Sequence, residues 1–209
     1  MAGVMSTVKL FIKGIQVACL AILCATSHAD LSVAQEQSVM EVTNQHKRMG
    51  TAWAFQDGYA ITAAHVVDGE PLVNVTYMGI TYRCRVLSRW DQYDIALLSV
   101  PGLDVVSPLK VADRVNTGAP IIIYGFPGGE PYSRSAGYVT GTESIIQYKY
   151  HLRRTGTTTA RVKGGYSGGP VVDRRTNEVV GVLTNRESSF FSSYSNGVFT
   201  RCDHLMGLW

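Results

Sequence analysis

Residues 50–62 read GTAWAFQDGYAIT, which is two short β-type runs on either side of a turn. The runs 50–55 and 59–62 are rich in small, aromatic and β-branched residues, and the QDG between them is typical of a β-hairpin. Similar runs recur along the chain and predict strands over 73–77, 82–87, 95–100, 120–124, 136–142, 144–150, 170–172, 179–183 and 197–201. Their number and spacing predict an all-β protein built as an antiparallel barrel or sandwich.

The composition fits a folded chain made of two β units. Of the 209 residues, 45% are hydrophobic and 17% are charged, so the chain can bury a core. Residues 101–118 (PGLDVVSPLKVADRVNTG) have low strand character and several turn residues, and we expect them to link the two units. Residues 30–48 are polar and irregular, and we expect a flexible segment there.

The first 29 residues have the layout of a secretory signal peptide. Two lysines precede or enter the apolar stretch 14–26 (GIQVACLAILCAT), and small residues lie one and three positions before Asp30. The apolar stretch is shorter than the roughly 20 residues that span a bilayer. We therefore expect cleavage after Ala29 and a secreted or periplasmic protein, with a membrane anchor as the alternative if the leader is retained. Without the leader, 17 basic residues face 16 acidic ones, and this net charge of +1 predicts no nucleic-acid partner.

Residues 164–170 (GGYSGGP) are the strongest local indication of chemistry. A serine between glycines suits a nucleophile on a tight turn. The backbone N–H groups of Gly165 and Ser167 could then hold the oxyanion that forms when a carbonyl is attacked. A plain glycine-rich hairpin turn is the alternative for this motif alone.

Two further segments contain groups that could activate Ser167. His65, in ITAAHVV (61–67), follows a predicted strand and two alanines, which leave room for the imidazole to reach a partner. Asp94, in YDIALL (93–98), leads directly into an apolar strand, where a carboxylate is costly to bury unless it is paired. It suits the role of accepting the Nδ1 proton of His65. Alone, each residue could equally be structural.

At these three segments the chain resembles the chymotrypsin-like (trypsin-type) serine peptidases. The TAAH, DIALL and GxSGGP motifs occur together and in the family's order of His, Asp and Ser. The resemblance implies two antiparallel six-stranded Greek-key β-barrels with the active site in the cleft between them, and a short C-terminal helix. It assigns His65 and Asp94 to a barrel over 49–112, and Ser167 to a barrel over 113–209. The pattern is most similar to the bacterial glutamyl-endopeptidase-like and HtrA-like branches, without a PDZ domain.

The resemblance implies a serine endopeptidase that acts on a protein or peptide. Ser167 would attack the peptide carbonyl, His65 would accept and return the proton, and Asp94 would orient His65. Thr184 falls where the family has a hydroxyl residue that supports the aspartate. No metal or organic cofactor is implied. Tyr166 replaces an aspartate that pairs with the new N-terminus in animal digestive enzymes, so an activation switch of that type is not expected.

The resemblance also predicts a substrate pocket from five residues: Thr159, Arg161, Leu183, Asn185 and Gly197. Basic side chains near it would favour an acidic substrate residue before the scissile bond, unless they are solvated on the outer face. These side chains are Arg161, Lys163, Arg186, Arg201 and His204.

Other interpretations of the same features stay open. Residues 165–169 (GYSGG) also fit the G-x-S-x-G turn of α/β-hydrolases, although those enzymes need a downstream acid and histidine and a parallel sheet. The double-barrel frame could instead serve as a noncatalytic peptide-binding or scaffolding module. Cys84 and Cys202 could pair in an exported protein or remain buried thiols, and we give the disulfide only as a tentative expectation.

Overall fold

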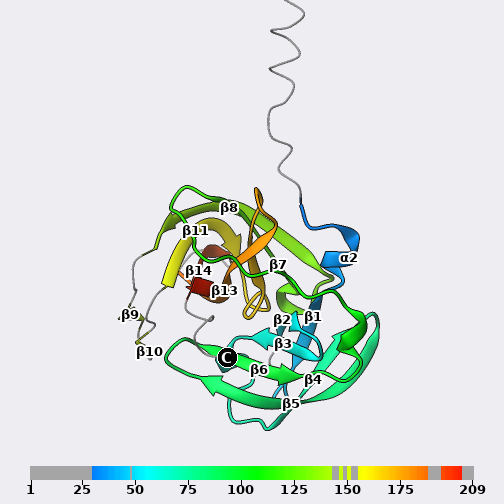
Figure 1. Ribbon diagram of the computed structural model, residues 1–209. Coiled ribbons are helices and arrows are strands. Elements are labelled where there is room, and N and C mark those ends of the chain that lie inside the picture. Colours follow the sequence, from blue (N-terminus) through cyan, green and yellow to red (C-terminus); the bar gives the residue numbers. More distant parts are fainter. Residues whose placement is uncertain are drawn as a thin grey trace, which may run out of the picture.

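The computed structural model describes residues 30–47, 49–142, 146–147, 150–151, 155–187 and 194–203. Two closed six-stranded antiparallel β-barrels make up most of this part of the chain (Figure 1). The predicted all-β double-barrel architecture is therefore confirmed, and the α/β-hydrolase alternative is wrong. The expected signal peptide over 1–29 lies outside the described residues, and so does the last segment of the chain, where a C-terminal helix was expected.

The first barrel is closed by pairing between its first and fourth strands. Around the barrel the order is β1 (Val39–Thr43), β2 (Met49–Gln56), β3 (Tyr59–Thr62), β6 (Ile95–Ser99), β5 (Ile80–Trp90) and β4 (Leu72–Tyr77). Side chains alternate between the interior and the surface, because successive residues of a strand point to opposite faces. In β4, Val73 and Val75 are buried, whereas Asn74 between them is exposed.

The second barrel repeats the strand order of the first. Numbered along the chain within each barrel, both follow 1-2-3-6-5-4. The strands are β7 (Pro120–Gly125), β8 (Ser133–Gly141), β11 (Thr155–Val162), β14 (Ser195–Arg201), β13 (Glu178–Arg186) and β12 (Pro170–Asp173). Phe199 fills the interior between Gly156 and Gly181, where a Cβ on either glycine would collide with its ring.

Shorter elements precede the first strand or lie between the barrel strands. They are α2 (Val33–Glu36), η1 (Ala64–Val66), η2 (Leu103–Val105), η3 (Pro127–Gly129) and the two-stranded sheet of β9 (Ile146–Gln147) and β10 (Tyr150–His151). No helix among the described residues is long and apolar enough to cross a membrane.

Two parts of the sequence-based prediction need correction. Within the segment 30–48, the described residues 30–47 are not a flexible lead-in, because β1 lies among them and closes the first barrel with Met40 and Val42 fully buried. The first barrel therefore begins at Val39, ten residues before the expected boundary at 49. The strand β11 was not predicted. Its inward residues include Thr158 and Ala160, which give little hydrophobic signal.

The two barrels share one buried apolar cluster, in addition to a cluster within each barrel. A single buried cluster contains Trp53, Ile61 and Ile95 from the first barrel together with Tyr124 and Val182 from the second. Burial of apolar surface from both units favours their association. Because this shared cluster packs side chains of both barrels together, it helps to fix the position of one barrel, and its catalytic candidates, relative to the other.

The linker between the barrels also packs on both of them. Leu109 donates its backbone N–H to the Ala54 carbonyl in β2 at 3.0 Å, and Ala112 donates to the Val179 carbonyl in β13 at 2.9 Å. The side chains of Leu109 and Ala112 are buried. Residues 101–118 thus join two β units as predicted and are anchored on each.

Candidate active site

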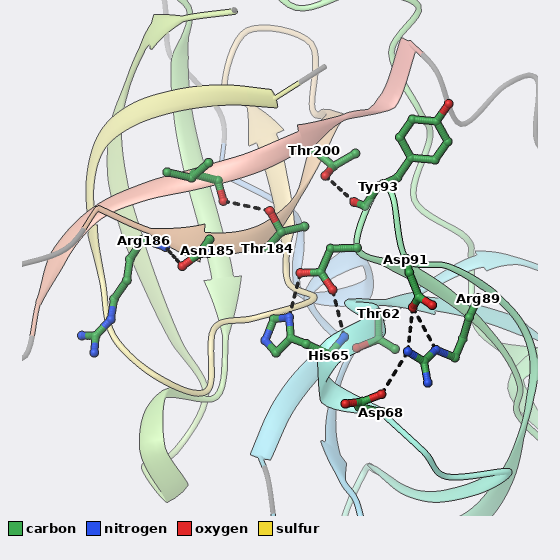
Figure 2. A network of polar contacts seen from close by, with 12 residues as sticks. Thr62, His65, Asp68, Arg89, Asp91, Tyr93, Thr184, Asn185, Arg186 and Thr200 are labelled. Carbon is green, nitrogen blue, oxygen red and sulfur yellow. Dashed lines mark hydrogen bonds and ion pairs between the residues drawn. The ribbon is translucent and has the colours of Figure 1, made fainter. Parts of the chain in front are cut away.

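Asp94 and His65 meet at one end of the first barrel, on segments joined by the β3–β6 pairing. His65 lies in η1, just after β3, and Asp94 immediately precedes β6. The ring Nδ1 of His65 lies 2.7 Å from Asp94 Oδ2, and the backbone N–H of His65 donates to Asp94 Oδ1 at 2.8 Å (Figure 2). Asp94 also accepts a hydrogen bond from Ala64 N through its backbone carbonyl, at 3.1 Å. One aspartate therefore positions both the ring and the backbone of the histidine.

The environment of this pair suits a base whose outer nitrogen faces the surface. The Asp94 side chain is only 10% exposed, whereas that of His65 is 36% exposed. A buried carboxylate is stabilised by the donors that it accepts, and here it favours the tautomer with the proton on Nδ1. Asp94 also has a φ of +53°, a left-handed conformation that is uncommon outside glycine and is held here by these bonds.

The second barrel supports the segment that carries Asp94. Thr200 Oγ1, on β14, donates to the carbonyl of Tyr93 at 2.6 Å (Figure 2). Thr184, to which the resemblance assigned the supporting role, is buried on β13 and donates to the Val198 carbonyl at 3.4 Å. Of these two threonines, Thr200 makes the shorter contact and reaches the residue next to Asp94. In the sequence, the only indication of this role of Thr200 was a hydroxyl residue within an apolar strand.

An ion-pair bridge joins the same two segments near the surface. Arg89 Nη2 lies 2.6 Å from Asp91 Oδ1 and 3.1 Å from Asp68 Oδ1 (Figure 2). Asp91 is three residues before Asp94, and Asp68 is three residues after His65. Exposed ion pairs contribute only about 0–1 kcal/mol to stability. This bridge therefore holds the two segments together less strongly than the Asp94–His65 contact does.

Ser167 lies on the turn between β11 and β12, against the segment that leads to His65. Gly168 has no room for a side chain, since a Cβ there would collide with the Thr51 carbonyl and lie 2.8 Å from Ala63 N. The N–H of Thr51 also donates to the Ser167 carbonyl at 2.8 Å. Because Ala63 is two residues before His65, the serine turn and the histidine segment are in contact across the boundary between the barrels.

Glycine gives the turn a shape that other residues rarely adopt. Gly165 has a φ of +100° and Gly168 a φ of +88°, values that favour glycine. A Cβ at Gly165 would collide with the Phe126 carbonyl and with Gly128 N, so the turn packs closely on η3. The glycines in the GGYSGGP motif are therefore required by backbone conformation and close packing.

Side chains beside Ser167 also anchor the turn. The hydroxyl of Tyr166 donates to Ser133 Oγ at 3.1 Å, and burial raises the pKa of this phenol, so it stays protonated at neutral pH. Lys163 forms an ion pair with Glu130, whose hydrogen bond raises the pKa of the lysine. Tyr166 thus ties the turn to β8 through a neutral contact, at the position where animal digestive enzymes have an aspartate.

The five residues predicted to form a substrate pocket lie on three strands of the second barrel, β11, β13 and β14. Leu183 is buried in the second barrel, and a Cβ at Gly197 would lie 3.0 Å from its Cδ1. Thr159 and Arg161 are exposed on the opposite face of β11, and Asn185 is exposed near the end of β13. Strand alternation therefore separates the inward residues of this set from the outward ones, and the predicted pocket stays a prediction.

The basic side chains expected near that pocket are partly neutralised. Lys163 is paired with Glu130, and Arg201 with Asp203. Arg161 donates to the Tyr194 carbonyl at 2.7 Å. His204 lies outside the described residues. These pairings weaken the argument for an acidic substrate residue.

The tentative disulfide between Cys84 and Cys202 is wrong, because both cysteines are free and buried. Cys84 lies in the core of the first barrel, and Cys202 lies in the cluster shared by the two barrels. Burial raises the pKa of Cys84 to about 11 and also raises that of Cys202. Both thiols therefore stay protonated at neutral pH, which makes them poor nucleophiles. Nowhere in the described ranges do three histidine, cysteine or acidic residues form a group suited to a metal.

Residues 50–182 match the trypsin-like peptidase domain family, and the chain belongs to that family. This range includes the Asp94–His65 pair and the Ser167 turn.

Among individual relatives, the chain is similar to the serine protease Rv3671c of Mycobacterium tuberculosis (strain ATCC 25618 / H37Rv). The two are 29% identical over 161 residues, which cover 72% of this chain and 40% of the relative. A crystal structure of the active form of that protease matches with a TM-score of 0.73 at 25% identity, covering 83% of this chain and 80% of that one.

Two further matches come from DegP-like and HtrA-type proteases. A probable periplasmic DegP-like serine endoprotease of Marinomonas sp. (strain MWYL1) is 25% identical over 167 residues, covering 78% of this chain and 33% of the relative. The HtrA-type protease AlgW, solved with a tripeptide, shares the fold with a TM-score of 0.76 at 21% identity, covering 88% of this chain and 62% of that one. The chain thus spans 40% or less of the length of these two curated relatives.

Proposed function

We propose that the chain is a serine endopeptidase that uses His65, Asp94 and Ser167 as its catalytic triad. The observation that carries this proposal is the pair of hydrogen bonds that Asp94 accepts from His65, on a segment packed against the Ser167 turn. A buried carboxylate that fixes a partly exposed imidazole also stabilises the imidazolium that forms when the outer ring nitrogen takes up a proton. Membership of the trypsin-like peptidase domain family supports the same conclusion.

The proposed reaction proceeds through an acyl-enzyme. Nε2 of His65 accepts the hydroxyl proton of Ser167 while Oγ bonds to the carbonyl carbon of the substrate, and Asp94 stabilises the resulting imidazolium. The backbone N–H groups of Gly165 and Ser167 donate to the oxyanion. The C–N bond then breaks as His65 delivers the proton to the leaving amine. Water, deprotonated by His65, hydrolyses the ester and regenerates Ser167.

We also propose that the protein works in the periplasm or after secretion, once the leader has been cleaved after Ala29. The DegP-like relative is described as periplasmic, which supports this location. The residues that follow the expected cleavage point are docked on the second barrel. Asp30 pairs with Arg134 at 2.5 Å, and Leu31 is buried with its N–H donating to Tyr124 Oη at 3.1 Å. Mass measurement of exported protein should therefore give a chain that begins at Asp30.

Hydrolysis of casein by the exported protein tests the catalytic proposal. We expect Ser167→Ala to lower kcat on the order of 10³-fold or more. The matched control is Ser107→Ala, at an exposed serine of the linker, which should hydrolyse casein like the wild type. Equal activity in Ser167→Ala and the wild type would refute the nucleophile assignment. Binding of peptides without hydrolysis would instead favour the noncatalytic module.

A further inference from the structure

Thr51 is a first-barrel residue that contacts the nucleophile turn of the second barrel through both its backbone and its side chain. It lies on β2 and is fully buried. Its N–H donates to the Ser167 carbonyl at 2.8 Å, and its hydroxyl donates to the Gly165 carbonyl at 2.8 Å. The same hydroxyl accepts a hydrogen bond from Phe126 N at 3.1 Å. Its backbone N–H and its hydroxyl therefore both form hydrogen bonds across the boundary between the barrels.

The two carbonyls that Thr51 holds lie on either side of the N–H of Ser167. Peptide groups are planar, so fixing the Gly165 carbonyl fixes the plane of the peptide group between residues 165 and 166. Fixing the Ser167 carbonyl likewise fixes the peptide group between residues 167 and 168. Gly165 and Ser167 are also the residues whose N–H groups would hold the oxyanion. Thr51 thus restrains the short stretch of backbone on which both donors lie.

The hydroxyl of Thr51 is closely packed as well as hydrogen-bonded. A Cβ at Gly125 would lie only 2.7 Å from Thr51 Oγ1, which leaves no room for a larger neighbour. With one donor and one acceptor both fixed, the hydroxyl has a defined orientation. Removing it would leave Phe126 N and the Gly165 carbonyl without this partner.

Thr51 is also tied to the strand that leads to His65. The hydroxyl of Thr62 donates to the Thr51 carbonyl at 2.7 Å, and β2 pairs with β3 through Ala52 and Thr62. Thr62 is three residues before His65. The same pair of strands therefore holds Thr51 and leads directly into η1, which carries the proposed base.

We infer that Thr51 is a positioning residue that holds the oxyanion-hole turn of the second barrel in register with His65 of the first. This inference rests on the proposed peptidase function. Because the hydroxyl restrains the donors and does not touch the substrate, its loss should impair transition-state stabilisation more than substrate binding.

Kinetics of Thr51→Val and Thr51→Ser test the inference. Losing a whole oxyanion donor costs about 10²–10³-fold in kcat, and a loosened donor should cost less, so we expect Thr51→Val to lower kcat about tenfold or more. We expect KM to stay within about twofold. Thr51→Ser keeps the hydroxyl and should restore most of kcat. Thr76→Val, which removes a hydroxyl from the exposed Thr76–Thr81 pair of the same barrel, is the matched control.

Amide hydrogen exchange over residues 163–169 provides a readout that does not need activity. We expect Thr51→Val to speed exchange in this segment about tenfold or more and Thr51→Ser to leave it near the wild-type rate. If the wild type hydrolyses nothing but the two variants show this exchange pattern, the restraint by Thr51 is supported and only the peptidase proposal is wrong. If the wild type is active and Thr51→Val keeps its kcat and its exchange rates, only the inference is wrong. Should Thr51→Val not fold, Thr51→Ala replaces it, and wild-type kcat in that folded variant would equally overturn the inference.

Discussion

The two barrels have the same strand order but hold their parts of the site by different means. In the first barrel, side chains do the positioning, since both carboxylate oxygens of Asp94 bind His65. In the second barrel, backbone conformation does it, since the turn around Ser167 depends on positive φ at Gly165 and Gly168. The base half of the site should therefore be sensitive to changes of charge and hydrogen bonding, and the nucleophile half to any added Cβ.

The sharpest test of the side-chain half is Asp94→Asn. An amide cannot stabilise the imidazolium, and it favours the wrong tautomer of His65. We expect kcat to fall about 10⁴-fold, with little change in the fold. The measurement is kcat on a peptide substrate, with circular dichroism as the check on folding. Asp91→Asn, at the exposed neighbour whose carboxylate pairs with Arg89, is the control and should stay within a few-fold of wild type.

The backbone half is tested by Gly165→Ala. The added Cβ would collide with the Phe126 carbonyl and with Gly128 N, so the turn must move. We expect kcat to fall about 10²-fold or more, since the oxyanion donors are displaced. The matched control is Gly69→Ala, where φ is +74° and nothing lies within 4 Å of the new Cβ. It should cost about 1 kcal/mol of unfolding free energy and leave kcat unchanged. Similar kcat values in the two variants would contradict the importance of the turn's shape.

The contact between the halves is tested by Thr200→Val. This change removes the hydrogen bond to the Tyr93 carbonyl, so the Asp94 segment loses its support from β14. We expect a loss of about 1 kcal/mol in unfolding free energy, and a fall of several-fold in kcat. Thr140→Val, at an exposed threonine of β8, should have a smaller effect on both. Identical denaturation midpoints and kcat in the two variants would mean that Thr200 supports nothing specific.

The smallest effect is expected from a reducing agent. Because Cys84 and Cys202 are free and lie in different apolar clusters, neither barrel depends on a disulfide. The melting temperature of the exported protein should be the same with and without dithiothreitol. A clear drop on reduction would show a covalent link that this structure lacks.

The sequence was most informative where chemistry and backbone shape require particular residues. His65 and Asp94 stand at strand ends with few acceptable substitutes, and the glycines around Ser167 mark a turn that other residues cannot form. Most strands were also visible, because their apolar side chains alternate. These features are local, so a single sequence displays them.

What the sequence did not reveal depends on contacts between distant segments. The strand β1 becomes clear only through its pairing with β2 and β4, and β11 has small or polar residues facing inward. Thr51 resembles any threonine in a strand, because its partner Gly165 is 114 residues away. The positions of the pocket candidates were hidden for a related reason, since which face of β11 a residue occupies depends on the register of the barrel.

The most direct test of the central claim is labelling with a fluorophosphonate, followed by peptide mapping. If His65, Asp94 and Ser167 act together, the wild type should carry one adduct, on Ser167. The rate of labelling should fall by about 10³-fold or more in His65→Ala, since the hydroxyl loses its base. An adduct at another residue, or equal labelling rates in wild type and His65→Ala, would contradict the account.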